Sequence, residues 1–126
     1  MFSPKSAFSG FSVDDLAKAK TFYSSTLGLI VEADGVGARI HLPGGATVFF
    51  YPKPDHQPAT FTILNFEVDD IDDAVASLAD RGVTLERYEG IEGLDEQGIL
   101  RGRARNLGPD IAWFLDPARN VLSVLH

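Results

Sequence analysis

Cysteine is absent from this chain of 126 residues, which excludes disulfides, thiolate nucleophiles and cysteine-ligated zinc sites. Basic residues are also scarce, because 11 Lys and Arg stand against 18 Asp and Glu, a net charge of −7. Such a chain repels a phosphate backbone, so nucleic acid is not expected as a partner. No stretch approaches the roughly 20 apolar residues of a membrane span, and the N-terminus lacks the apolar core of a secretory signal. We therefore expect a cytoplasmic protein with no membrane partner.

The residues that are present indicate an ordinary globular protein. Hydrophobic residues make up 44% of the chain and charged residues 23%, which is the balance of a folded domain and not of a disordered or fibrous chain. A length of 126 residues fits one domain with a sizeable core, and two separate domains would not fit.

A short pattern occurs twice. Val13-Asp14-Asp15-Leu16 is matched by Val68-Asp69-Asp70-Ile71, an offset of 68 − 13 = 55 residues. Each copy follows a segment typical of a strand, residues 7–13 and 61–68, and each precedes apolar residues at helical spacing. Asp15 and Asp70 are placed to cap these helices by accepting from free backbone amides, and Gly28 and Gly82 stand where the helices should end. The acidic residues at the two junctions are therefore interpreted as structural caps.

Three short strands are expected after each helix. In the first half they cover residues 29–33, 38–42 and 47–51, and in the second half 84–88, 111–115 and 121–125. A long polar segment, 89–110, separates the first two strands of the second half. Each half is thus predicted to run strand, helix and three strands, and the proline-containing segment Lys53–Pro58 links the halves.

With these junctions, the pair Phe22-Tyr23, the turn Leu27-Gly28-Leu29 and the closing segment Trp113 to Asn120, the chain resembles the vicinal oxygen chelate superfamily. This group contains glyoxalase I, extradiol dioxygenases, fosfomycin-resistance enzymes and bleomycin-binding proteins. The resemblance implies one glyoxalase-like domain over 1–126 with an α+β fold. Two βαβββ modules, 7–52 and 60–126, joined by a linker at 53–59, would form a curved mixed sheet around a cavity. The closing turn departs from the family pattern, because Arg119 replaces a glycine.

The resemblance also implies four positions for metal ligands, which here hold Phe8, Phe49, Ile63 and Ser123. Two phenyl groups and an isoleucine cannot bind a divalent ion, and a serine hydroxyl is a poor single ligand. The histidines, His41, His56 and His126, form no metal-binding spacing pattern. We therefore expect no metal ion and no other cofactor.

Strand alternation predicts which side chains share a face with these four positions. The expected inward set is Phe8, Gly10, Ser12, Thr47, Phe49, Tyr51, Phe61, Ile63, Asn65, Glu67, Val121, Ser123 and Leu125. The opposite set is continuously apolar and suits packing under the helices: Phe11, Val13, Val48, Phe50, Leu64, Phe66, Val68, Leu122 and Val124. The inward set has the profile of a small-molecule pocket. The alternative is that Phe8, Phe49 and Ile63 fill the space as a core.

Two functions remain open. The first is a metal-free small-molecule binding protein of the glyoxalase and bleomycin-resistance type, which sequesters an aromatic or cationic ligand. The alternative is a metal-dependent lyase or dioxygenase with a relocated metal site that uses His41 or Glu67. No catalytic residue is assigned. The predicted ligand-binding residues are Phe8, Ser12, His41, Thr47, Phe49, Tyr51, Ile63, Asn65, Glu67, Trp113 and Ser123.

Two further expectations concern a loop and the assembly. Arg101, Arg103 and Arg105 lie within five residues, where they either grip an anionic group of a ligand or form a solvated loop. From the resemblance we also expect a homodimer. Light scattering that gives the mass of one chain, 13.7 kDa, would contradict the dimer.

Overall fold

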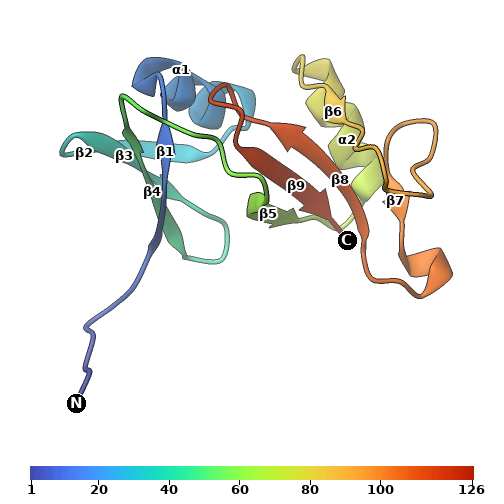
Figure 1. The fold of residues 1–126 in the computed structure, drawn as a ribbon, viewed down its shortest axis with the longest axis horizontal. Coiled ribbons are helices and arrows are strands. Elements are labelled where there is room, and N and C mark those ends of the chain that lie inside the picture. The colour runs from blue at the N-terminus through green and yellow to red at the C-terminus, as the bar shows by residue number, and fades with distance from the viewer. The chain divides into compact units, whose positions relative to one another are not determined.

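The computed structural model describes residues 1–126, and the chain forms two compact units, Met1–Pro58 and Ala59–His126. In each unit a strand is followed by a helix and then by further strands that build one sheet (Figure 1). The predicted α+β class and the doubled strand-helix-strand order are confirmed. Each unit is described below by itself.

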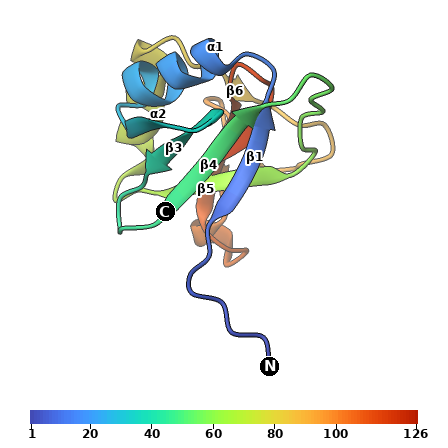
Figure 2. The same cartoon turned by 90° about the vertical axis from the view of Figure 1, so that its left-hand side faces the viewer.

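Unit 1 contains four strands and one helical segment. They are β1 (Ser9–Val13), α1 (Leu16–Thr21), the π-helical turn η1 (Phe22–Thr26), β2 (Ile30–Asp34), β3 (Gly37–His41) and β4 (Thr47–Pro52). The strand order is β1-β4-β3-β2, in which β1 and β4 run parallel and the other pairs are antiparallel. Figure 2 shows β1 and β4 side by side and pointing in the same direction.

Both ends of the first helix follow from the sequence. The Asp15 carboxylate accepts from the Lys18 amide at 3.0 Å, which is the predicted N-cap. After Thr21 the helix widens, and the Leu27 amide donates to the Phe22 carbonyl five residues earlier at 2.9 Å. Gly28 then takes a left-handed conformation, with φ of +72°, which ends the segment.

An aromatic cluster fills the core of unit 1 between the helical segment and the sheet. Tyr23 and Phe50 are fully buried. The Tyr23 ring lies 5.4 Å from that of Phe50 and 5.8 Å from that of Phe11. Val13 and Val48 are buried as well, so the helix-facing residues of β1 and β4 are those that alternation predicts.

Unit 2 contains β5 (Thr62–Glu67), α2 (Ile71–Asp80), β6 (Leu85–Glu86), β7 (Leu100–Arg101), the 3₁₀ turn η2 (Arg103–Arg105), β8 (Asp110–Leu115) and β9 (Val121–Leu125). The strand order is β5-β9-β8-β6, and β7 also pairs with β8. Asp70 caps α2 by accepting from the Asp73 amide at 3.0 Å, as predicted. The expected strand 84–88 is only two residues long, and the polar segment 89–110 contributes β7 and η2.

A bulge in β5 corrects the strict alternation expected there. Thr62 pairs with Val121 and Leu64 with Leu122, so Ile63 is an extra residue on this strand. Because of this insertion, Thr62 lies on the same face of the sheet as Asn65, where strict alternation places Ile63. A sequence pattern of period two cannot show such an inserted residue.

Hydrogen bonds between Asp116 and Asn120 hold the closing turn between β8 and β9, in which Arg119 takes the place of a glycine. The buried Asp116 carboxylate accepts from the Asn120 amide at 2.8 Å and from its side-chain Nδ2 at 3.1 Å. The Asp116 amide donates to the Asn120 carbonyl at 3.0 Å. Arg119 has φ of +69°, a left-handed conformation that disfavours a side chain.

We expect Arg119→Gly to stabilise unit 2 by about 0.5–1 kcal/mol. Relief of the left-handed strain outweighs the extra freedom that glycine gives the unfolded chain. Urea unfolding measures the difference, and Arg119→Ala is the matched control, because it removes the same charge and keeps the strain. Equal stabilities of the glycine and alanine variants would contradict this explanation.

Candidate functional site

The sheet face of unit 1 that is opposite to α1 gathers most of the predicted ligand-binding residues of this half. Phe49 is in register with Gly10 on one side and Arg39 on the other, and Arg39 is in register with Glu32. Paired residues of neighbouring strands share a face. This face, called face 1 below, comprises Gly10, Ser12, Ile30, Glu32, Asp34, Gly37, Arg39, His41, Thr47, Phe49 and Tyr51.

Two aromatic rings form the apolar part of face 1. The rings of Phe49 and Tyr51 stack with 5.9 Å between centroids and 18° between planes. Phe49 extends over Gly37, because a Cβ at Gly37 would lie only 2.8 Å from Phe49 Cζ. Both rings are only half-buried. A planar apolar group can therefore stack on this side of the sheet.

Arg39 is a candidate site residue of face 1 that the sequence reasoning missed. Its Nε donates to Asp34 Oδ2 at 2.9 Å, its Nη2 lies 2.8 Å from the same oxygen, and its Nη1 donates to Thr47 Oγ1 at 3.2 Å. The guanidinium carbon lies 4.6 Å from the centre of the Phe8 ring. Alternation along β3 puts Arg39 on the same face as His41, and this pattern could have identified Arg39 from the sequence.

Two polar pairs complete the surroundings of face 1. His41 Nε2 lies 3.1 Å from Glu32 Oε2, and Ser12 Oγ lies 2.6 Å from His56 Nδ1. His41 and Ser12 thus lie on the predicted face, and each already has a partner. His56 comes from the linker, which therefore contributes to unit 1 beside β1.

The sheet face of unit 2 that is opposite to α2 holds a second polar row, called face 2. Asn65 pairs with Ser123, and Ser123 pairs with Trp113. The fully buried Ser123 hydroxyl donates to Asn65 Oδ1 at 2.6 Å. Trp113 Nε1 donates to Thr62 Oγ1 at 3.2 Å, so Thr62 replaces Ile63 in this row. The three predicted residues Asn65, Trp113 and Ser123 are therefore brought together.

Tyr88 adds an unpaired hydroxyl beside face 2. Its ring meets that of Trp113 edge-on, with 5.9 Å between centroids. The Tyr88 hydroxyl oxygen is buried and has no hydrogen-bond partner. Burial raises the pKa of Tyr88, and the nearby Glu86 carboxylate raises it further. The group is therefore a neutral phenol at neutral pH.

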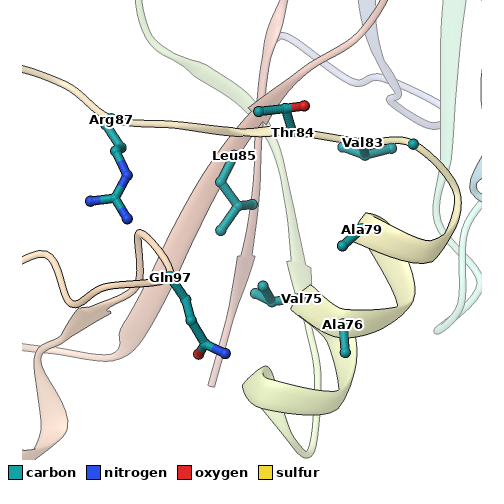
Figure 3. A pocket seen from close by; sticks show the side chains of 9 residues that line it. Val75, Ala76, Ala79, Val83, Thr84, Leu85, Arg87 and Gln97 are labelled. Atoms are coloured by element: carbon teal, nitrogen blue, oxygen red, sulfur yellow. The ribbon is translucent and has the colours of Figure 1, made fainter.

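Two hollows in unit 2 lie mostly apart from the predicted residues. A groove of about 500 Å³ runs between α2 and the segment after it, where Val75 and Leu85 form an apolar floor and Arg87 and Gln97 stand at one end (Figure 3). Arg87 donates to the backbone carbonyls of Asp95, at 3.3 Å, and Glu96. A second hollow, of about 490 Å³, is lined by Glu67 and His126 among others. Of the predicted ligand-binding residues, only Glu67 lines either hollow.

The three arginines of the segment 101–105 differ in their surroundings. Arg101 binds Asp72 through two hydrogen bonds, at 2.6 and 3.2 Å, and Asp95 at 3.0 Å. The Arg101 guanidinium therefore ties the long segment before β7 to α2. Arg103 and Arg105 are exposed, in the 3₁₀ turn. Arg101 therefore fits neither the ligand-gripping nor the solvated-loop interpretation, because its guanidinium is bound to carboxylates of the protein itself.

The residues at the four family positions do not fit a metal ion. The Arg39 guanidinium lies over the Phe8 ring, and the Phe49 ring stacks on that of Tyr51. Ile63 is the bulge residue, and the Ser123 hydroxyl is used by Asn65. No group of three or more histidine and carboxylate side chains is arranged to hold a metal ion.

Comparison with known proteins establishes the family. The profile of the Glyoxalase/Bleomycin resistance protein/Dioxygenase superfamily matches residues 8–124, so the chain belongs to this superfamily. A search of curated proteins returned no match. No helix in the structure has the length and apolar character needed to span a bilayer.

Solved structures agree with this assignment. TnmS3, an antibiotic binding protein from Streptomyces sp. CB03234, is 26% identical, with a TM-score of 0.63 and 98% of each chain covered. The fosfomycin resistance protein FosX from Listeria monocytogenes is 13% identical, with a TM-score of 0.66 and coverage of 99% of this chain and 93% of that one. A putative glyoxalase family protein from Bacillus anthracis is 15% identical, with a TM-score of 0.66 and coverage of 99% and 98%. The last two show the fold alone.

Proposed function

We propose that this protein is a metal-free binding protein that sequesters a small molecule with an aromatic ring. The observation that carries the proposal is the stacked pair Phe49 and Tyr51 on face 1, which is bordered by fixed polar groups. A few oriented polar groups beside an aromatic surface are typical of small-molecule sites. The likeness to TnmS3, whose name states antibiotic binding, supports the same class of function.

The residues at the family's metal positions favour binding over metal-dependent catalysis. A catalytic metal needs about three fixed protein donors and an open position. Of Phe8, Phe49, Ile63 and Ser123, only the serine carries a donor atom, and it is engaged by Asn65. His41 and Glu32 together supply only two metal-donor groups, which is fewer than such a site requires.

A titration with planar aromatic compounds tests the proposal. Proflavine, a cationic tricycle, and 2-acetonaphthone, a neutral bicycle, are titrated against the protein while the melting temperature is followed. We expect at least one compound to raise the melting temperature with a saturable dose response. Phe49→Ala should weaken binding about five- to tenfold, because a ring that stacks contributes about 1–1.4 kcal/mol.

Phe2→Ala is the matched control, because it removes an exposed phenyl group that lies before β1. The control should leave binding unchanged. If neither compound changes the melting temperature, face 1 is not a binding site for such compounds and the proposal is wrong.

A further inference from the structure

Arg39 has two N–H groups that the protein does not use. A guanidinium carries five N–H donors. Three of them are directed to protein oxygens, because Nε and Nη2 approach Asp34 Oδ2 at 2.9 and 2.8 Å and Nη1 reaches Thr47 Oγ1 at 3.2 Å. One N–H on Nη1 and one on Nη2 therefore remain for an acceptor from outside the protein.

These two donors are held in place before any ligand arrives. Asp34 and Thr47 fix the guanidinium in its plane, and the Phe8 ring, 4.6 Å away, covers one of its sides. The side chain of Arg39 is 26% exposed, so it is neither a free surface group nor sealed in the core. A donor that is already ordered costs little entropy when it binds.

An aromatic surface lies on the strand that pairs with the strand of Arg39. Phe49 is the residue in register with Arg39 on the neighbouring strand β4, and its ring stacks on Tyr51. The absence of a side chain at Gly37 leaves the space that the Phe49 ring occupies. A flat molecule on Phe49 can therefore present its edge to the Arg39 guanidinium.

The charges around Arg39 select among acceptors. Asp34 neutralises the guanidinium, and Glu32, in register with Arg39, adds a second carboxylate. The formal charges of Glu32, Asp34 and Arg39 sum to −1 − 1 + 1 = −1. An anionic group would meet this negative charge, whereas a neutral carbonyl oxygen accepts the same two hydrogen bonds without repulsion.

We propose that face 1 recognises a planar aromatic compound with a neutral carbonyl oxygen, which accepts from the two remaining N–H groups of Arg39 while the ring stacks on Phe49. This inference rests on the proposed function and names the class of its ligand. It departs from a cationic ligand, which the net charge alone favours, because the two remaining Arg39 groups are hydrogen-bond donors and a cation without a free acceptor atom cannot accept from them.

Matched probes test the inference. Equilibrium dialysis compares 2-acetonaphthone with 2-ethylnaphthalene, which has the same rings and lacks the carbonyl, and with 2-naphthoate, which is anionic. We expect the ketone to bind about tenfold more tightly than the hydrocarbon, the effect of hydrogen bonds to a charged donor. Arg39→Met should bring that ratio close to one, and Phe49→Ala should weaken both neutral probes alike.

Asp34→Asn separates a ligand contact from a structural ion pair. This variant removes the neutralising charge and keeps the shape, so 2-naphthoate, which binds more weakly than the ketone to the wild type, should gain affinity. If Arg39 served only to stabilise the hairpin, both variants would lower the melting temperature while every probe ratio stayed unchanged, and the inference would be wrong. Equal binding of ketone and hydrocarbon to the wild type overturns the inference and leaves the proposed function standing. Failure of all three probes, and of proflavine as well, to bind overturns both.

Discussion

Replacing Gly37 with alanine is expected to destabilise unit 1 by about 3 kcal/mol, a large effect for one methyl group. A Cβ at this position would overlap the backbone carbonyl oxygen of Phe50 and lie 2.8 Å from Phe49 Cζ. Phe50 belongs to the buried aromatic core, so its backbone cannot move aside without disturbing Tyr23. Urea unfolding monitored by circular dichroism measures the loss.

Gly10→Ala is the matched control on the other side of β4. Its Cβ would lie 3.3 Å from the Phe49 carbonyl oxygen, a tight contact without overlap. This variant should lose less than half as much stability as Gly37→Ala. Similar losses for the two variants would mean that the close approach over Gly37 is unimportant.

Arg101→Met is expected to lower the melting temperature by about 5 °C at neutral pH. The guanidinium holds Asp72 and Asp95, and its removal releases the segment before β7 from α2. A hydrogen bond from Arg101 lowers the pKa of Asp72. Partial burial opposes ionisation of Asp95, but donors from Ile99 and Arg101 hold the pKa of Asp95 below its usual value.

The pH dependence of this effect has a definite sign. Both carboxylates have a lower pKa in the folded state than in the unfolded chain, where the pKa is about 3.9. The contribution is therefore complete above about pH 4 and is lost as pH falls through the folded pKa values. The difference in melting temperature between wild type and Arg101→Met should be constant above about pH 4 and shrink as the pH falls below that value.

Arg103→Met controls for the loss of a positive charge, because Arg103 is exposed in the 3₁₀ turn. This variant should melt within about 1 °C of the wild type at every pH. A pH-independent difference for Arg101→Met would show that lost packing, and not the ion pairs, explains its effect.

Much of the fold was predictable because local chemistry decides it. Asp15 and Asp70 cap their helices in the structure, because a carboxylate at the start of a helix satisfies amides that have no other partner. The apolar residues of β1 and β4 face the helix, because one side of each strand must be buried. Gly28 and Gly82 have positive φ, as helix ends require.

Features that depend on pairing between distant segments were not predictable. The bulge at Ile63 is set by the register of β5 against β9, which leaves no mark on the alternation of either strand alone. Arg39 looked like an ordinary charged strand residue, and the role that we propose for it follows only from its contacts with Asp34, Thr47 and Phe8. Arg101 likewise finds Asp72, 29 positions away, only after folding.

Binding in the presence of a chelator tests the central claim, a metal-free aromatic binding site, most directly. The protein is dialysed against EDTA, its content of zinc, nickel, manganese and iron is measured, and the ketone probe 2-acetonaphthone is then titrated with and without added metal ions. We predict saturable binding with the same dissociation constant in all samples, because the contacts we propose come from Phe49, Tyr51 and Arg39 and involve no metal ion. One tightly held metal ion per chain, or binding that disappears with the chelator and returns with a metal, would contradict the account.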